Sequence, residues 1–257
     1  MDALEALKEG ADHLSRSFNS GFVFGPVTQY TLWLAIVFVV VLLVVLTAAK
    51  KLELVPNNKF VNMVEYGYDF VCSDMGENAI GHGYKQHIPF LATLFFFILI
   101  ANFIGLVPGF KTPTGTLSIT WALALISFIY FNYYGIKAKG GLGYLKSIAP
   151  SGLPVVMVPI IWFFELISLV LRLLTLAVRL YGNMFAGHMV LGIFALATSV
   201  FIQAAIQNMS IATALPSIGW FALLVAMYAL ETLVAFLQAY VFTILSAVYV
   251  SLATSEH

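Results

Sequence analysis

Residues Leu171–His188 of this chain read LRLLTLAVRLYGNMFAGH, a segment apolar enough to lie in a membrane although it carries Arg172 and Arg179. An arginine keeps its positive charge at every pH that a cell reaches. Placing one at the depth of a bilayer costs at least about 2.5–3.5 kcal/mol. A segment with two such residues is expected to use the charge, and the rest of the chain is interpreted as the scaffold that places Arg179 opposite a partner.

The composition of the whole chain is that of a membrane protein. Of its 257 residues, 61% are hydrophobic and only 9% are charged, whereas about 25% of the residues of a typical soluble domain are charged. Several apolar runs exceed the roughly 20 residues that a helix needs to cross a bilayer. The predicted fold class is therefore all-α, a polytopic membrane protein. Twelve basic and twelve acidic residues leave no net charge, so nothing indicates a nucleic-acid partner.

Three transmembrane spans are predicted in residues 29–152. They cover about residues 31–49, 88–106 and 117–136. In the polar stretch 50–87, apolar residues recur at helical spacing and predict a helix along the membrane surface; they are Val61, Val64, Tyr68 and Val71. The aromatic runs Phe95–Phe97 and Tyr130–Tyr134 are expected to face lipid or the membrane interface.

Basic residues are more frequent in the loops on one side of the membrane than in those on the other. That side holds Lys50, Lys51, Lys59, Lys85, Lys137, Lys139 and Lys146, and the other holds Lys8, Arg16 and Lys111. Cytoplasmic loops are enriched in Lys and Arg. The loops at 50–87 and 137–152 are therefore predicted to be cytoplasmic, with an extracytoplasmic segment at residues 1–28.

The last part of the chain, residues 153–257, differs from the first. The runs 153–188 and 218–252 contain no loop signal, and a helix of the first run would be about 54 Å long, well beyond a hydrocarbon core of about 30 Å. Between them lies a polar stretch, 203–217. We predict a hairpin of two long, steeply tilted helices whose turn lies outside and whose C-terminal tail is cytoplasmic.

Polar residues follow one face of each of these two helices. On the first, successive members are three or four residues apart and so share a face; they are Glu165, Ser168, Arg172, Thr175, Arg179 and Asn183. On the second, Glu231 and Gln238 are also on one face. Pairing Arg179 with Gln238, or His188 with Glu231, puts the antiparallel turn near residues 208–209 in both cases. Polar groups on both sides of one fixed cation are what two offset half-channels need.

Three stretches carry a family resemblance. Arg179–His188 (RLYGNMFAGH) resembles the signature of subunit a of F-type ATP synthases, 237–252 is similar to that family's last helix, and 102–108 (NFIGLVP) resembles its second-span motif. The resemblance implies a stationary, proton-conducting subunit in which Arg179 deprotonates the carboxylate of a rotating c-subunit ring.

The resemblance also implies roles for the other polar residues. Gln238 is the neighbour of the arginine; the outer half-channel holds His188, Glu231 and Asn183; and Glu165 belongs to the inner one, with Ser168, Arg172 and Thr175 on its face. Some relatives carry the acid and the histidine exchanged between positions 188 and 231, which suits a pair that works as a unit. Some have an acid where this chain has Gly105, so in the second span only Asn102 is given a channel role.

The implied partners are the c-subunit ring, the b-subunit stator stalk, the rest of the ATP synthase and membrane lipid. Protons are the expected ion, with Na⁺ the less favoured one. The implied location is a bacterial plasma (inner) membrane, with an organelle inner membrane as the alternative. The chain is not expected to be an enzyme by itself, because no nucleophile–base pair is evident.

Other interpretations stay open. Arg172 and Arg179 could bind the carboxylate of a substrate in a proton-coupled or anion secondary transporter, and a structural membrane anchor is a third possibility. Arg172 could simply pair with Glu165, seven residues away on the same face. No cofactor is expected, and no metal, since His188 and Glu231 lack the third and fourth ligands of a metal site.

Overall fold

The computed structural model describes residues 22–24, 27–50, 58–107, 109–141, 143–144, 157–208 and 211–254. In these ranges nearly all elements are helices, so the predicted all-α class is confirmed. The elements are β1 (Phe22–Phe24), β2 (Val27–Thr28), α2 (Gln29–Lys50), α3 (Lys59–Phe70), the π-helix η1 (Val71–Glu77), α4 (Asn78–Ile80), η2 (Tyr84–Gln86), α5 (Ile88–Leu106), η3 (Pro113–Gly115), α6 (Leu117–Lys139), α8 (Val158–Asn208) and α9 (Ile211–Thr254). Five of the described helices are long and apolar enough to cross a membrane: α2, α5, α6, α8 and α9.

The three N-terminal spans have the predicted positions. Helix α5 has the predicted bounds, while α2 and α6 extend by a few residues to lysines in their last turns. Lysine at a helix C-terminus is stabilised by the exposed carbonyl groups there. Pro89 lies in the first turn of α5, where its missing N–H removes no hydrogen bond.

Helices α8 and α9 form the predicted long hairpin, but the turn is shorter than expected. Helix α8 has 51 residues and α9 has 44, which corresponds to lengths of about 76 and 66 Å. The polar stretch 203–217 is not a loop, since α8 continues to Asn208 and α9 begins at Ile211. Pro216 removes one backbone hydrogen bond near the beginning of α9 without ending it.

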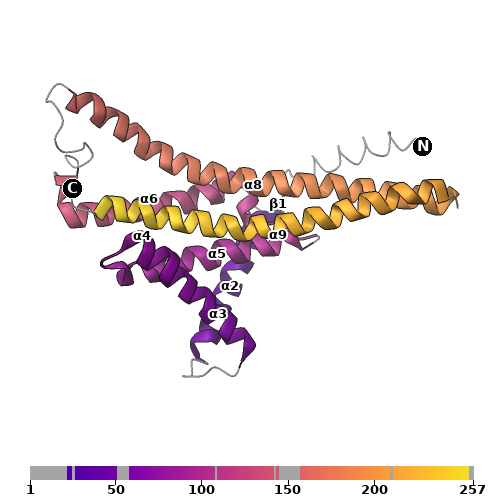
Figure 1. Ribbon diagram of the computed structural model, residues 1–257, viewed down its shortest axis with the longest axis horizontal. Helices are drawn as coiled ribbons and strands as arrows, with labels where there is room; N and C mark the ends of the chain where they lie inside the picture. The colour runs from indigo at the N-terminus through magenta and orange to yellow at the C-terminus, as the bar shows by residue number, and fades with distance from the viewer. Residues whose placement is uncertain are drawn as a thin grey trace.

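The hairpin organises the rest of the fold. In Figure 1, α8 and α9 lie side by side toward their turn and diverge toward the beginning of α8, while α5 and α6 pack along them. Helices α2 and α3 lie beyond α5 on the side away from α8. Helix α9 is therefore the central element, in contact with α5, α6 and α8.

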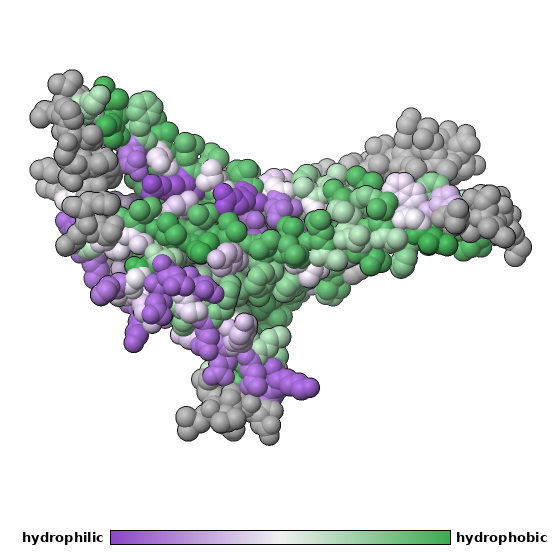
Figure 2. Space-filling view, viewed as in Figure 1, coloured by the Kyte–Doolittle hydropathy of each residue, from purple (hydrophilic) through white to green (hydrophobic). Residues whose placement is uncertain are grey.

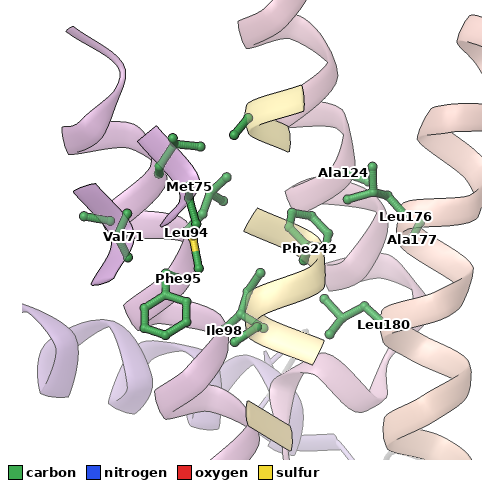
Figure 3. Close-up of a cluster of buried hydrophobic side chains, with 14 residues drawn as sticks. Val71, Met75, Leu94, Phe95, Ile98, Ala124, Leu176, Ala177, Leu180 and Phe242 are labelled. Atoms are coloured by element: carbon green, nitrogen blue, oxygen red, sulfur yellow. The ribbon is translucent and has the colours of Figure 1, made fainter. Parts of the chain in front are cut away.

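The core lies where these four helices meet. In Figure 3, Phe242 of α9 lies between Ile98 of α5 and Leu180 of α8. Phe95 is only 2% exposed and belongs to this core, so the expectation that it faces lipid is wrong. The reason is that α5 is apolar on all sides, and its pattern cannot separate a lipid face from a packed face.

The polar stretch after α2 contains the predicted helix. Asn58 caps α3 by accepting a hydrogen bond from the backbone N–H of Phe60. Val61 and Val64 are buried, as is Val71 at the beginning of η1. The predicted extracytoplasmic segment at residues 1–28 lies largely outside the described residues.

Candidate functional site

Arg179 lies at the middle of α8 and its side chain is exposed. It lines a shallow groove of about 610 Å³ between α8 and α9. The groove is otherwise apolar except for Asn183 and Gln238. Figure 2 shows a hydrophilic group over α8, midway along the helix pair and enclosed by hydrophobic surface. Within the described part of the chain, no carboxylate lies within 4.0 Å of the Arg179 guanidinium.

The side chains of Asn183 and Gln238 connect the two helices beside Arg179. The Asn183 amide Nδ2 donates to Gln238 Oε1 across a long distance of 3.5 Å. Gln238 is 6% exposed, and its own Nε2 has no hydrogen-bond partner among the described residues. The contact agrees with the antiparallel register that the sequence predicts, in which Arg179 and Gln238 share one level.

Glu231 is buried between the two helices, one level nearer their turn. It is 3% exposed, and its Oε1 has no hydrogen-bond partner in the described structure. Its carboxylate lies directly against Gly187, where any larger side chain would collide with it. Because Gly187 has no side chain, there is room at this position for the carboxyl group of Glu231, which the antiparallel pairing of α8 and α9 places opposite it.

His188 follows Gly187 and faces a cavity of about 280 Å³. The cavity is bounded by the ends of α2 and α5, by the loop before η3, and by α8 and α9; its polar members include Tyr30, Lys111, Thr112 and Tyr228. His188 Nε2 is buried and has no partner among the described atoms. It lies 3.0 Å from the point that a Cβ atom on Gly105 would occupy, so a larger residue at position 105 would crowd it.

His188 and Glu231 thus occupy neighbouring levels without bonding to each other. The described structure does contain an ion pair, but it joins Arg172 and Glu165. Buried polar atoms without partners cost about 1–3 kcal/mol each, so each one in a native protein calls for an explanation, such as a bound water or ion or a catalytic role. Three such atoms follow one another in space from the cavity toward Arg179: His188 Nε2, Glu231 Oε1 and Gln238 Nε2.

Asn102 has a different setting from these residues. It is fully buried, and its Nδ2 donates to the Ala235 carbonyl at 3.2 Å while its Oδ1 accepts from Thr114 Oγ1 at 2.8 Å. The Thr112 hydroxyl bonds to Thr114 at 2.7 Å and to the Ala101 carbonyl at 3.0 Å. Asn102 therefore attaches the η3 loop to α9, one turn beyond Glu231, and its amide is not among the groups that line the cavity.

The polar residues toward the beginning of α8 form a second group. Arg172 Nη2 donates to Glu165 Oε1 at 3.0 Å, and the guanidinium carbon lies 5.4 Å from the ring centre of Tyr249 on α9. Thr175 donates its hydroxyl to the Arg172 carbonyl one turn back, at 3.1 Å, which is the local interaction common for threonine in helices. Ser168 lies between Glu165 and Arg172 on the same face and is partly exposed.

Several residues at the site were not predicted from the sequence. Tyr30, Lys111 and Tyr228 line the cavity beside His188, and Tyr249 lies under Arg172. These residues come from α2, from the loop before η3 and from α9, and no spacing pattern connects them. Within the described ranges no three His, Cys, Asp or Glu residues gather to hold a metal ion.

Comparisons with known proteins bear on the same region. The family model described as ATP synthase A chain matches residues 30–251. The chain is 38% identical over 243 residues to ATP synthase subunit a of a Nocardioides species, covering 93% of this chain and 86% of that protein. It is 43% identical over 204 residues to ATP synthase subunit a of Hyphomonas neptunium, covering 79% and 78%. It is 44% identical over 188 residues to ATP synthase subunit a 1 of Brucella anthropi, covering 73% and 72%.

Proposed function

This chain belongs to the ATP synthase A chain family, and from that premise we propose that it is the stationary, non-catalytic subunit that conducts protons past Arg179. As a family member it is a membrane subunit of the F-type ATP synthase, with a role in ATP synthesis and ion transport. The finer proposal is that Arg179 deprotonates carboxyl groups carried past it by a rotating c-subunit ring, and that protons reach it through two offset half-channels.

The observation that carries the proposal is the setting of Arg179. Its guanidinium is exposed in a groove whose other lining residues are apolar except for Asn183 and Gln238, and no described carboxylate lies within 4.0 Å of it. A permanent charge facing lipid without a partner would cost several kcal/mol. An acidic group on a partner's membrane helix would remove this cost, which supports an acidic rotor surface as the occupant of the groove.

The chemistry of such a pair follows from electrostatics. A carboxyl group that moves through lipid must be protonated, because an ionised carboxylate there is very costly. Opposite Arg179 the ionised form is favoured, so the proton leaves. Arginine suits this task because it does not itself release a proton. Each elementary charge that crosses 100 mV supplies about 2.3 kcal/mol.

The outer half-channel follows the buried atoms without partners. The cavity ends at His188, Glu231 lies beyond it, and Gln238 and Asn183 lie beside Arg179. In our proposal a proton passes from the cavity to His188, then to Glu231, and from there to the ring carboxyl group. Neighbouring polar atoms of this kind can exchange protons directly or through a water molecule.

The inner half-channel is proposed along the opposite part of the same helix face. Ser168 and Thr175 lie there, between Arg179 and the beginning of α8. Because this path and the outer one both stop at Arg179, a proton cannot cross without riding on the ring. The two access paths can then be open at the same time without a leak.

The remaining proposals concern the neighbours of the chain and its place in the membrane. The chain lies in a membrane as part of the ATP synthase complex. We propose the c-subunit ring and the b-subunit stator stalk as its neighbours, a bacterial inner membrane as its location, and a cytoplasmic C-terminus. Lysines in the last turns of α2 and α6 support that orientation.

A secondary transporter that binds a substrate carboxylate between two arginines receives no support. Arg172 already holds Glu165 at 3.0 Å, so its charge is not available to an anionic substrate. Arg179 also lines an open groove, whereas a transporter would hold its substrate in an enclosed binding site.

The deciding experiment replaces the arginine in the assembled complex. In inverted membrane vesicles, Arg179→Ala is expected to abolish ATP-driven proton pumping, and Arg179→Lys is expected to do nearly the same because a lysine can release its proton. The conservative variant Lys137→Arg, at the cytoplasmic end of α6, is the matched control and should pump normally. Wild-type pumping and unchanged passive proton permeability in Arg179→Ala would refute the proposal.

A further inference from the structure

Two arginines lie on the same face of α8, and only one of them is free to act on a passing group. Arg172 and Arg179 are seven residues apart, so their side chains point the same way about 10 Å apart along the helix. Arg172 is held by Glu165 at 3.0 Å, while no described carboxylate reaches Arg179. The face therefore carries one neutralised and one uncompensated cation.

Without Glu165, the charge of Arg172 would interfere with the release of a passing carboxylate from Arg179. A carboxylate that has lost its proton near Arg179 would be attracted to a second guanidinium nearby and held between the two. At a partly buried site, one unit charge about 10 Å away changes the ratio of ionised to protonated carboxyl groups about tenfold. Such a second attraction would delay reprotonation of the carboxylate and its return to lipid.

We propose that Glu165 neutralises Arg172, so that a carboxylate passing along this face of α8 meets a single uncompensated cation, Arg179. This inference rests on the proposed function and extends it, because it gives Glu165 an electrostatic task in place of proton transfer. Glu165 acts through Arg172 and is a positioning residue in this scheme.

The contacts around Arg172 support the proposal. Its guanidinium lies over the ring of Tyr249 on α9, a contact of the cation–π type. The side chain of Arg172 is 24% exposed and that of Glu165 is 37% exposed, so both remain near enough to the surface to influence a passing charge.

The test is a double-mutant cycle in the assembled complex. ATP-driven proton pumping is measured in inverted vesicles for Glu165→Gln, Arg172→Gln and the double variant, each at equal membrane-bound ATP hydrolysis. Glu165→Gln leaves Arg172 uncompensated and is expected to slow pumping about tenfold. The double variant has no charge at either position and is expected to pump within about twofold of wild type, because the pair is removed as a unit.

Two outcomes would overturn the proposal. If Glu165→Gln pumps like wild type, Arg172 needs no neutralisation. If the double variant is as slow as Glu165→Gln, then Glu165 itself carries protons or holds the fold. Failure of the underlying function is recognised separately, because Arg179→Ala would then still pump.

Further variants keep the test decisive. Glu165→Asp keeps the negative charge and is expected to pump nearly normally. Glu77→Gln makes the same chemical change at an exposed carboxylate of η1 and should have no effect. If Glu165→Gln fails to assemble, the exchanged pair Glu165→Arg with Arg172→Glu decides instead: it stays neutral, so pumping supports the proposal and loss of pumping in assembled complex refutes it.

Discussion

Replacing Gly187 by alanine tests whether the buried carboxylate of Glu231 has to lie where the structure places it. A Cβ atom at position 187 would overlap that carboxylate. Ala235 and Ala239, one and two turns further along α9, are fully buried, so α9 is closely packed next to this point. The flexible end of the Glu231 side chain must therefore move.

The expected change in stability is small, and the expected change in function is large. An added methyl group in a packed site costs about 1–3 kcal/mol, and replacing a helical glycine by alanine returns roughly 0.5–1 kcal/mol. The net loss is about 0–2.5 kcal/mol, which a packed bundle of this size tolerates. A displacement of about 1 Å in a proton-transferring group can lower its rate about 100-fold. We expect Gly187→Ala to lower ATP-driven pumping by about 10- to 100-fold.

A shorter acid should relieve the collision. In the double variant Gly187→Ala with Glu231→Asp, the carboxylate is withdrawn by one methylene group, and pumping should exceed that of Gly187→Ala alone. Gly219→Ala is the matched control, since a Cβ atom there meets nothing within 4 Å. The reasoning is refuted if Gly187→Ala pumps like wild type, or if the aspartate gives no recovery while the complex assembles.

Two further predictions concern the contribution of buried polar groups to stability. Asn102→Leu removes two buried hydrogen bonds and is expected to lower the free energy of unfolding by about 1–3 kcal/mol; an unchanged thermal midpoint in detergent would contradict this. Burial lowers the pKa of His87 below its usual value, so the unfolded chain binds the proton more readily, and stability should fall as the pH drops through about 6.5. The midpoint of His87→Gln should fall less steeply between pH 7 and 5 than that of wild type, and equal slopes would refute the assignment.

The positions of the membrane spans could be predicted, because they depend only on the length of a hydrophobic run. The pairing of polar residues between α8 and α9 could be predicted too, because it depends only on the helical period and on the position of the turn. Bilayer thickness sets the length of a spanning helix, which is why α5 begins and ends where the hydrophobic run does. The helical period places Arg179 opposite Gln238 once the turn is near residues 208–209. The bond between Asn183 and Gln238 agrees with that register.

The faces of the apolar helices could not be predicted. A transmembrane helix that is apolar all round has no polar side to mark its orientation. Phe95 is therefore predicted to face lipid, although it packs in the hydrophobic core. For Asn102, the motif predicts a channel role, which stays a prediction; only the packing shows that both ends of its amide are bonded.

By itself, the sequence determined that this protein is a bundle of membrane helices with a long hairpin and a charged face, because hydrophobicity and spacing are local properties. Only the tertiary structure decided which of the two arginines on that face is neutralised and which is not. It also decided that Gly187 accommodates the carboxyl group of Glu231 and that His188 borders a cavity. The last two are contacts between residues far apart in the chain, and they depend on how side chains from several helices fill the same space.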